Sequence, residues 1–482
     1  MLFNSLKFLI FFPIVVMAYF SMPYRYRWIL LLLASYYFYM CWKAEYLLLI
    51  IVSTLIDYFA ALMMGNTDNK NKRKKYLFLS LLSNLGLLFA FKYFNFFSGS
   101  VYGIANHFNI FYHSPTFKLL LPVGISFYTF QTLSYTIDVY RGKQKPEKHL
   151  GIFAVYVAFF PQLVAGPIER STHLLPQFYR KNDVDYDRIS DGLKQMAWGF
   201  FKKLVIADRL AIYVNAIYNH PEKFSGAPLI LATYFFAFQI YCDFSGYSDI
   251  AIGASKVMGY DLMANFNRPY FSKSIGEFWK RWHISLSTWF RDYVYIPLGG
   301  NRVVKWRWYY NLFVTFLISG LWHGANWTFV FWGVLHGFYL VFSIWTETIR
   351  EKVARLFKID KRQKIQNLIK MFITFHLVCF GWIFFRANSL KDGFMIIKKI
   401  VLIDLHQLSI NVVPQMEKYN LAVAFIAIIA LVLVEVIQNY TQIIFFIKQR
   451  SFFLRWSIYG SFVLVIIYFG VFMSQQFIYF QF

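Results

Sequence analysis

The sequence predicts an all-α polytopic integral membrane protein, and two observations lead to this fold class. Hydrophobic residues make up 58% of the 482-residue chain and charged residues only 15%, whereas soluble domains carry about 25% charged residues. Apolar runs of roughly the 20 residues that cross a bilayer as a helix recur along the chain. They lie near residues 8–22, 28–43, 45–64, 76–95, 117–137, 150–166, 194–218, 228–257, 311–343, 366–386, 419–438 and 452–473. We therefore expect roughly ten to twelve transmembrane helices.

The polar stretches between these runs are short. The longest ones, 169–191 and 260–308, are too small for independent domains, so a single transmembrane domain over residues 1–482 is expected. Residues 260–308 mix aromatic, charged and proline residues. This mixture predicts re-entrant or interfacial helices.

Basic residues are in large excess, with a formal net charge of +25. They gather in short clusters between apolar runs, such as 24–27 and 70–75. This pattern follows the positive-inside rule for cytoplasmic loops and gives no indication of nucleic-acid binding. If both clusters are cytoplasmic, the N-terminus lies outside.

Metal and disulfide chemistry find no support in the sequence. Cys41, Cys242 and Cys379 are isolated and lack the spacing of a disulfide framework or a zinc site. The Gly-x-Ser-x-Gly, His-Glu-x-x-His and Gly-x-x-x-x-Gly-Lys signatures are missing as well. We therefore expect no metal and no bound cofactor.

His323 is the most informative polar residue. If a span begins near Asn311, His323 lies about 18 Å into the membrane, where a polar side chain is costly and is by default a functional candidate. A neutral imidazole there could act as a general base. For a lone histidine, a core residue bonded to a neighbouring helix is the simpler explanation. Gly320 and Gly324 would allow close approach of a backbone or a substrate.

The expected positions of Asn326 and His336 relative to His323 depend on a continuous helix through this run. Asn326, three residues after His323, could then orient the ring or stabilise an oxyanion. His336 would lie about 220° around such a helix from His323. We therefore expect His336 to be structural.

Residues 275–293 fit one amphipathic helix with an aromatic stripe. The apolar positions recur at three- and four-residue spacings; they are Trp279, Trp282, Leu286, Trp289 and Phe290. Glu277 and Arg281 are four residues apart and can pair. An interfacial helix without catalytic function explains the stripe, but it leaves His283 unexplained.

Asp243 and Asp249 lie within the apolar run 228–257. Two carboxylates at membrane depth could form the ion path of a transporter. They could instead anchor basic residues such as Arg281 or Arg291 and hold a site in shape. We favour this supporting role.

The strings around the two histidines resemble the membrane-bound O-acyltransferase superfamily. Residues 278–286 read FWKRWHISL, residues 290–293 read FRDY, and residues 320–324 read GLWHG. The family pattern is a histidine in a membrane helix preceded some forty residues earlier by Asn, Asp or His. Here His283 and His323 are forty residues apart.

Further strings are similar to the alginate O-acetyltransferase branch. They are LPVGISF at 121–127, FPQLVAGPI at 160–168, YCDFSGYSD at 241–249, MLFNS at 1–5 and GWIFFRA at 381–387. The resemblance runs nearly end to end, with a family core over about residues 120–390. It implies a multi-pass protein of the bacterial inner membrane.

The resemblance also implies an activity. An acyl group, usually acetyl, would be taken from a cytoplasmic thioester such as acetyl-CoA and passed across the membrane toward an extracytoplasmic polysaccharide. An SGNH-type partner protein commonly completes the transfer. The D-alanyl-transfer proteins of teichoic acid synthesis share the histidine pair and are the nearest alternative.

The catalytic residues expected from these arguments are His323, as general base, and His283, as an orienting or oxyanion-stabilising residue. The expected supporting residues are Asn326, Trp322, Asp243, Tyr247, Glu277 and Arg281. Two other hypotheses remain at this point. A transporter would depend on Asp243 and Asp249, and a scaffold for polysaccharide export would tolerate loss of His323.

Overall fold

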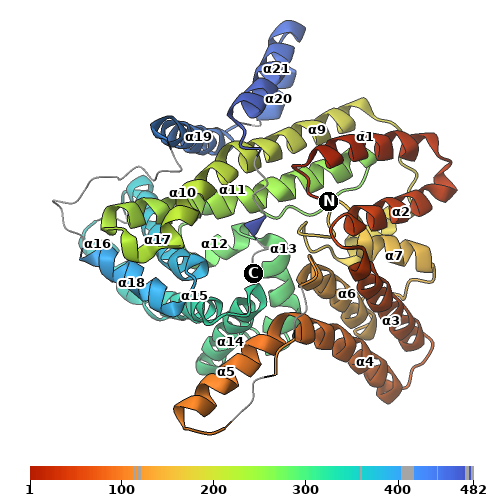
Figure 1. Ribbon diagram of the computed structural model, residues 1–482, viewed down its shortest axis with the longest axis horizontal. Coiled ribbons are helices and arrows are strands. Elements are labelled where there is room, and N and C mark those ends of the chain that lie inside the picture. The colour runs from red at the N-terminus through yellow and green to blue at the C-terminus, as the bar shows by residue number, and fades with distance from the viewer. Residues whose placement is uncertain are drawn as a thin grey trace.

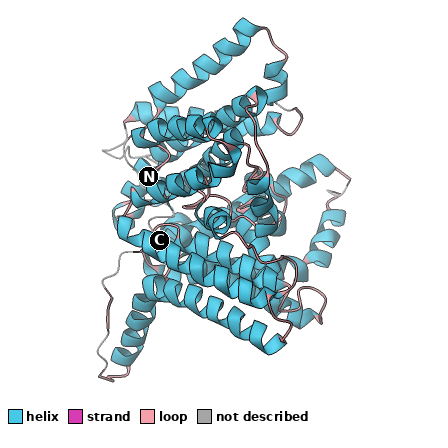
Figure 2. Ribbon diagram, turned by 90° about the vertical axis from the view of Figure 1, so that its right-hand side faces the viewer, coloured by secondary structure: helices cyan, strands magenta, loops and turns pink. Residues whose placement is uncertain are grey.

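The computed structural model describes residues 1–111, 115–117, 121–358, 361–402, 417–441, 443–472 and 477–478. Every regular element in these ranges is a helix (Figure 2). The sequence-based prediction of an all-helical fold is therefore confirmed.

The first half of the chain supplies helices α1 to α10. They are α1 (Leu6–Ser21), α2 (Arg27–Met40), α3 (Leu47–Gly65), α4 (Lys70–Leu88), α5 (Phe94–His107), α6 (Ile125–Tyr140), α7 (Leu150–Ala158), α8 (Ser171–Leu174), α9 (Tyr186–Phe200) and α10 (Asp208–Tyr218). Two π-helical turns join neighbouring helices without a break, η3 (Phe89–Tyr93) between α4 and α5 and η5 (Phe201–Ala207) between α9 and α10.

The second half supplies helices α11 to α21. They are α11 (Gly226–Met258), α12 (Ile275–Arg281), α13 (Ile284–Phe290), α14 (Lys305–His323), α15 (Trp327–Trp345), α16 (Glu347–Leu356), α17 (Gln363–Arg386), α18 (Leu390–Val401), α19 (Lys418–Ile437), α20 (Ile443–Lys448) and α21 (Phe452–Phe469). A third π-helical turn, η8 (Arg291–Tyr295), extends α13.

Seven helices among the described residues are long and apolar enough to cross a membrane. They are the helices at Ala44–Gly65, Lys70–His107, Gly226–Met258, Trp327–Trp345, Gln363–Arg386, Lys418–Ile437 and Phe452–Phe469. The expected count of ten to twelve is not confirmed. One reason is that the run at 150–166 forms only the nine-residue helix α7, which is about 14 Å long and too short to cross alone.

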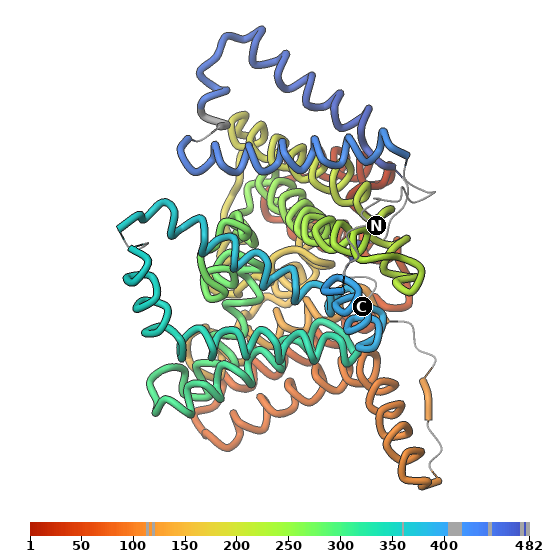
Figure 3. The backbone as a smooth tube through the Cα atoms, turned by 90° about the vertical axis from the view of Figure 1, so that its left-hand side faces the viewer, coloured from red at the N-terminus to blue at the C-terminus, as the bar shows by residue number. Residues whose placement is uncertain are grey.

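The long helix α11 is the centre of the fold, with α9 and α10 packed along it (Figure 1). Glycines bring α9 and α11 into backbone contact. A Cβ on Gly192 would lie 2.7 Å from the carbonyl oxygen of Gly253, and one on Gly199 would lie 2.6 Å from that of Gly246. Small residues allow this close approach in membrane helices. Helices α19 and α21 lie against the α9–η5–α10 segment at one edge of the protein (Figure 3).

The hydrophobic interior consists of two clusters. The first is built around α1–α7 and includes Leu286 and Trp322. The second is built around α10, α12, α15 and α17 and includes Trp282 and Trp332. Residues 282–286 and the end of α14 lie where the two clusters meet.

Candidate active site

The run that carries His323 folds as a hairpin of two helices. His323 is the last residue of α14 and is 3% exposed. Gly324 is extended, and α15 begins at Trp327. The expectation that His323 lies within a continuous helix is wrong, because this extended glycine ends the helix directly after it.

Close packing of the hairpin confirms the expected use of two glycines. A Cβ on Gly320 would lie 2.4 Å from the carbonyl oxygen of Phe329 and 3.0 Å from the Cα of Gly333. A Cβ on Gly324 would lie 2.3 Å from the ring of Phe329. The backbones of α14 and α15 therefore touch at the turn before His323, which fixes where that residue lies.

The break also changes the interpretation of Asn326 and His336. Asn326 is the N-cap of α15: its side chain accepts a hydrogen bond from the Thr328 amide at 3.0 Å and donates to the Asn388 carbonyl at 3.3 Å. Its geometry is that of a helix cap and not of a residue that orients His323.

His336 is fully buried on α15 and accepts a hydrogen bond from Trp279 Nε1 at 3.3 Å. The ring of Trp332 lies between His323 and His336, with centroids 5.0 and 4.8 Å away. His336 is thus nearer to His323 than a continuous helix would allow.

His283 lies at a sharp turn between α12 and α13. Its φ of +44° is a left-handed conformation that is uncommon for residues other than glycine. The expected single helix over 275–293 is therefore wrong, since the chain breaks at Trp282 and His283. All five aromatic or leucine residues of the stripe are buried in the protein. The segment is packed within the protein.

Aromatic rings enclose the imidazole of His283, which is 0% exposed. Phe244 lies edge-on with ring centroids 4.5 Å apart, and Phe127 lies 6.2 Å away in a stacked arrangement. The indole of Trp322 stands between the two histidines, 6.2 Å from the ring of His283 and 5.0 Å from the ring of His323. The structure therefore brings together His283, Trp322 and His323, which are all residues expected at the site.

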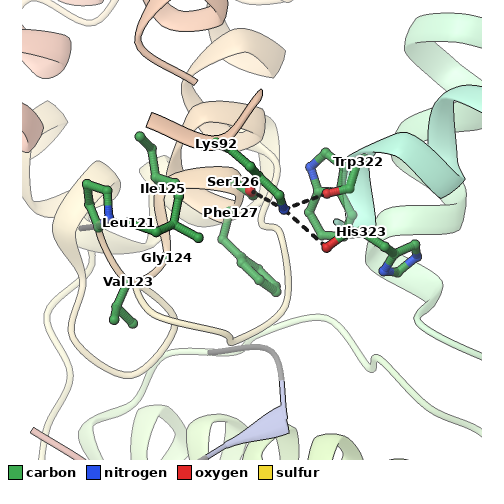
Figure 4. A pocket seen from close by; sticks show the side chains of 10 residues that line it. Lys92, Leu121, Val123, Gly124, Ile125, Ser126, Phe127, Trp322 and His323 are labelled. Carbon is green, nitrogen blue, oxygen red and sulfur yellow. Dashed lines mark hydrogen bonds between the residues drawn. The ribbon is translucent and has the colours of Figure 1, made fainter. Parts of the chain in front are cut away.

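A small cavity of about 40 Å³, part of it open to the outside, adjoins the end of α14. Trp322 and His323 line one wall, and residues 121–127 line the other. Lys92 reaches into this gap from the π-helical turn η3 (Figure 4). Its Nζ donates to the carbonyls of Trp322 at 2.8 Å and His323 at 3.1 Å, and to Ser126 Oγ at 3.4 Å.

Lys92 and its neighbour Tyr93 together cap the C-terminal end of α14. Tyr93 Oη donates to the carbonyl of Leu321 at 3.0 Å. The last carbonyls of a helix lack partners within the helix and carry partial negative charge, so an ammonium is favourable there. This cap holds the backbone of His323 in place from a segment more than two hundred residues away.

Asp243 and Asp249 each form an ion pair, but with other partners than those named from the sequence. Asp243 pairs with Lys203 at 2.6 Å and accepts a hydrogen bond from the Ile478 amide at 2.8 Å. Asp249 pairs with Lys202. The predicted partners are engaged elsewhere: Arg281 pairs with Glu277 at 2.7 Å, as expected for that pair, and Arg291 with Asp292 at 2.8 Å.

Tyr247, also expected as a support, is 6% exposed and contacts Phe3 and Phe477 at centroid distances of 4.5 and 4.9 Å. It lies on α11 and packs against residues near both ends of the chain.

Similarity to known proteins extends over most of the chain. The profile of the family described as MBOAT, membrane-bound O-acyltransferase, matches residues 149–388, a range that contains both histidines. The probable alginate O-acetylase AlgI of Pseudomonas aeruginosa is 41% identical over 393 residues, which cover 81% of this chain and 73% of the relative. The chain belongs to the membrane-bound O-acyltransferase family.

Other relatives of this O-acyltransferase are named for different acceptors. The peptidoglycan O-acetyltransferase of Helicobacter pylori is 36% identical over 402 residues, covering 77% of this chain and 73% of the relative. The teichoic acid D-alanyltransferase of Bacillus subtilis is 30% identical over 292 residues, covering 57% of this chain and 71% of the relative. The protein is therefore a multi-pass membrane O-acyltransferase.

Two residues that contact the histidine segments, Lys92 and Asn265, were not predicted from the sequence. Lys92 lies in the apolar run 76–95, and an ionisable residue inside such a run is itself a signal that could have singled it out. Asn265 bonds to His283 at 3.1 Å but lies in a polar loop, where nothing in the sequence distinguishes it.

Proposed function

We propose that this protein transfers an acetyl group from a cytoplasmic thioester, acetyl-CoA or a carrier-bound equivalent, to an extracytoplasmic polysaccharide. The observation that carries the proposal is the placement of two buried histidines on either side of one tryptophan, at the end of a helix that borders a cavity. The similarity to the alginate O-acetylase of Pseudomonas and the peptidoglycan O-acetyltransferase of Helicobacter supports an acetyl group and a glycan acceptor.

The chemistry needs a base and a dry site. In the proposed reaction His323 takes the proton of an acceptor hydroxyl as its oxygen attacks the thioester carbonyl. The new C–O bond forms, the C–S bond breaks, and the proton passes to the leaving thiolate. The surrounding rings of Trp322, Trp332 and Phe385 favour transfer over hydrolysis because they exclude water.

The route across the membrane is part of the proposal. The donor would approach from the cytoplasm of a bacterial cell, with the N-terminus on the outer side of the inner membrane. The acetyl group would pass to an SGNH-type partner protein or directly to the polysaccharide. The positive clusters at 24–27 and 70–75 support this orientation.

D-alanyl transfer to teichoic acid is the second candidate, and the relatives from Bacillus and Streptococcus favour it at 30% identity. The same two histidines would serve either reaction, because both reactions transfer an acyl group. The longer match to O-acetyltransferases, 81% of this chain against 57%, favours acetyl.

A transporter that uses Asp243 and Asp249 is disfavoured by their contacts. Each carboxylate is paired with a lysine on the α9–η5–α10 segment. A carboxylate with its charge neutralised in this way is a poor binding site for a moving cation.

The test is the O-acyl content of cell-surface polysaccharides from cells that lack the gene and carry wild-type protein, His323→Ala or His220→Ala. His220 is an exposed histidine and serves as the matched control. We expect ester-linked acetate with wild type and His220→Ala but none with His323→Ala at equal protein levels. Ester-linked D-alanine would establish the second candidate, and normal acetate with His323→Ala would contradict both.

A further inference from the structure

Asn265, in the loop after α11, is 1% exposed. Both the oxygen and the nitrogen of its side-chain amide form hydrogen bonds. Its Oδ1 accepts hydrogen bonds from the amide of Ser285 at 3.2 Å and from Ser285 Oγ at 2.9 Å. The same oxygen lies 3.1 Å from Nδ1 of His283. Its Nδ2 donates to Ser248 Oγ at 3.2 Å. One buried amide thus connects α11, the loop and the start of α13.

The contacts of Asn265 decide which of its atoms faces His283. A backbone N–H can only donate, so the atom that meets the amide of Ser285 must be the oxygen. That oxygen can only accept. Nδ1 of His283 must therefore carry a proton in order to bond to it.

In a neutral imidazole, a proton on Nδ1 leaves Nε2 without one. The imidazole of His283 is 0% exposed and surrounded by Phe127, Phe244 and Phe266. An imidazolium is costly in such a site, so the neutral ring is favoured. A neutral ring with its proton on Nδ1 carries a lone pair on Nε2.

Backbone hydrogen bonds keep this arrangement rigid. The Ile284 amide donates to the Asn265 carbonyl at 2.9 Å, and the Asn267 amide donates to the Arg281 carbonyl at 2.9 Å. These bonds hold the left-handed turn at His283 against the loop. The ring and its partner are therefore positioned by the same segment.

We propose that Asn265 is a positioning residue that fixes His283 as the Nδ1–H tautomer, so that Nε2 acts as a hydrogen-bond acceptor. Any group that meets Nε2 must then donate to it. His283 would orient the hydroxyl of the acceptor and would not stabilise an oxyanion. This role rests on the proposed acyl transfer, because it names the class of group that His283 receives.

The experiment measures the tautomer directly in the full-length protein in lipid nanodiscs, labelled with ¹⁵N-histidine. The resonances of His283 are identified by their loss in His283→Gln. We expect a protonated Nδ1 and an unprotonated Nε2 in the wild type and in Ser285→Ala, which keeps the amide contact. In Asn265→Leu, which has a similar size but no acceptor, we expect the Nε2–H tautomer to become populated.

Activity provides the second readout. We expect kcat of Asn265→Leu to fall by about 10- to 100-fold, the range found for residues that orient metal-binding histidines, with KM for the donor changed by less than about twofold. Asn265→Asp keeps an oxygen acceptor and should keep the Nδ1–H tautomer.

An Nε2–H tautomer in the wild type, or an unchanged tautomer in folded Asn265→Leu, overturns the inference. If Asn265→Leu does not fold, the spectra of the wild type and of Asn265→Asp still test the inference. An Nε2–H tautomer of His283 in either protein overturns it. Failure of the proposed acyl transfer is seen separately, as normal polysaccharide acetylation by His323→Ala, and leaves the tautomer result unaffected.

Discussion

The ammonium of Lys92 lies 3.1 Å from the carbonyl oxygen of His323, a residue 231 positions further along the chain. Lys92 also bonds the Trp322 carbonyl and Ser126, so each of its three N–H groups has an acceptor. The ammonium of Lys92 is therefore held at the C-terminal end of α14.

Replacement of Lys92 by methionine keeps the length of the side chain but removes these donors. Each charged hydrogen bond contributes about 1.5–3 kcal/mol, so we expect a lower thermal unfolding temperature and acyl transfer reduced about tenfold or more. Lys74→Met, at an exposed position of α4, is the control. Equal activity of the two variants would show that the cap does not position His323.

The contact between α14 and α15 gives a second prediction. In Gly320→Ala the new Cβ would lie 2.4 Å from a backbone oxygen, whereas a Cβ on Gly86 meets nothing within 4 Å. We expect Gly320→Ala to destabilise the protein by about 1–3 kcal/mol, because the hairpin must separate, and to lower activity. Gly86→Ala should unfold at the wild-type temperature or above, and a similar melting curve for the two variants would argue against the close packing.

The helical class, the burial of His323 and the close packing of the paired glycines could be predicted, because they depend on composition and local spacing. The break after His323 could not be predicted, because the sequence does not show whether the backbone of Gly324 is helical or extended. The left-handed turn at His283 is stabilised by hydrogen bonds to residues 265 and 267, which are tertiary contacts. The partners of Asp243 and Asp249 also depend on tertiary contacts, so they were expected at Arg281 or Arg291, whereas the structure pairs these carboxylates with Lys203 and Lys202.

The pair formed by Lys202 and Asp249 separates a supporting role from a transport role. Lys202→Met leaves Asp249 without its ion pair, so we expect a loss of stability of up to about 3 kcal/mol, limited because Asp249 is 21% exposed. The double variant Lys202→Met/Asp249→Leu removes both charges and should regain stability and acyl transfer. Loss of activity in a stable double variant would instead indicate that Asp249 is functional.

A pH-dependent contribution to stability is expected at His173. Its Nδ1 lies 2.8 Å from the buried carboxylate of Glu169, and this hydrogen bond raises the pKa of His173 above its ordinary 6.5. The folded state therefore binds the proton more tightly than the unfolded chain. The resulting stabilisation is fully present below about pH 6.5 and is lost as the pH rises through the folded pKa.

Thermal unfolding of the wild type and of His173→Gln at both ends of this range measures the effect. The difference between their unfolding temperatures should be larger at about pH 6 than at about pH 8.5. A difference that is the same at both pH values would show that the proton is not shared with Glu169.

The most direct test of the account is the rate of acetyl transfer from a radiolabelled thioester by purified His323→Ala in lipid nanodiscs. A general base contributes about 10²- to 10⁴-fold to the rate, so we predict a loss of at least about 100-fold in kcat with an unfolding temperature close to that of the wild type. A rate within about twofold of the wild type, at equal amounts of folded protein, would contradict the assignment of His323 as the base.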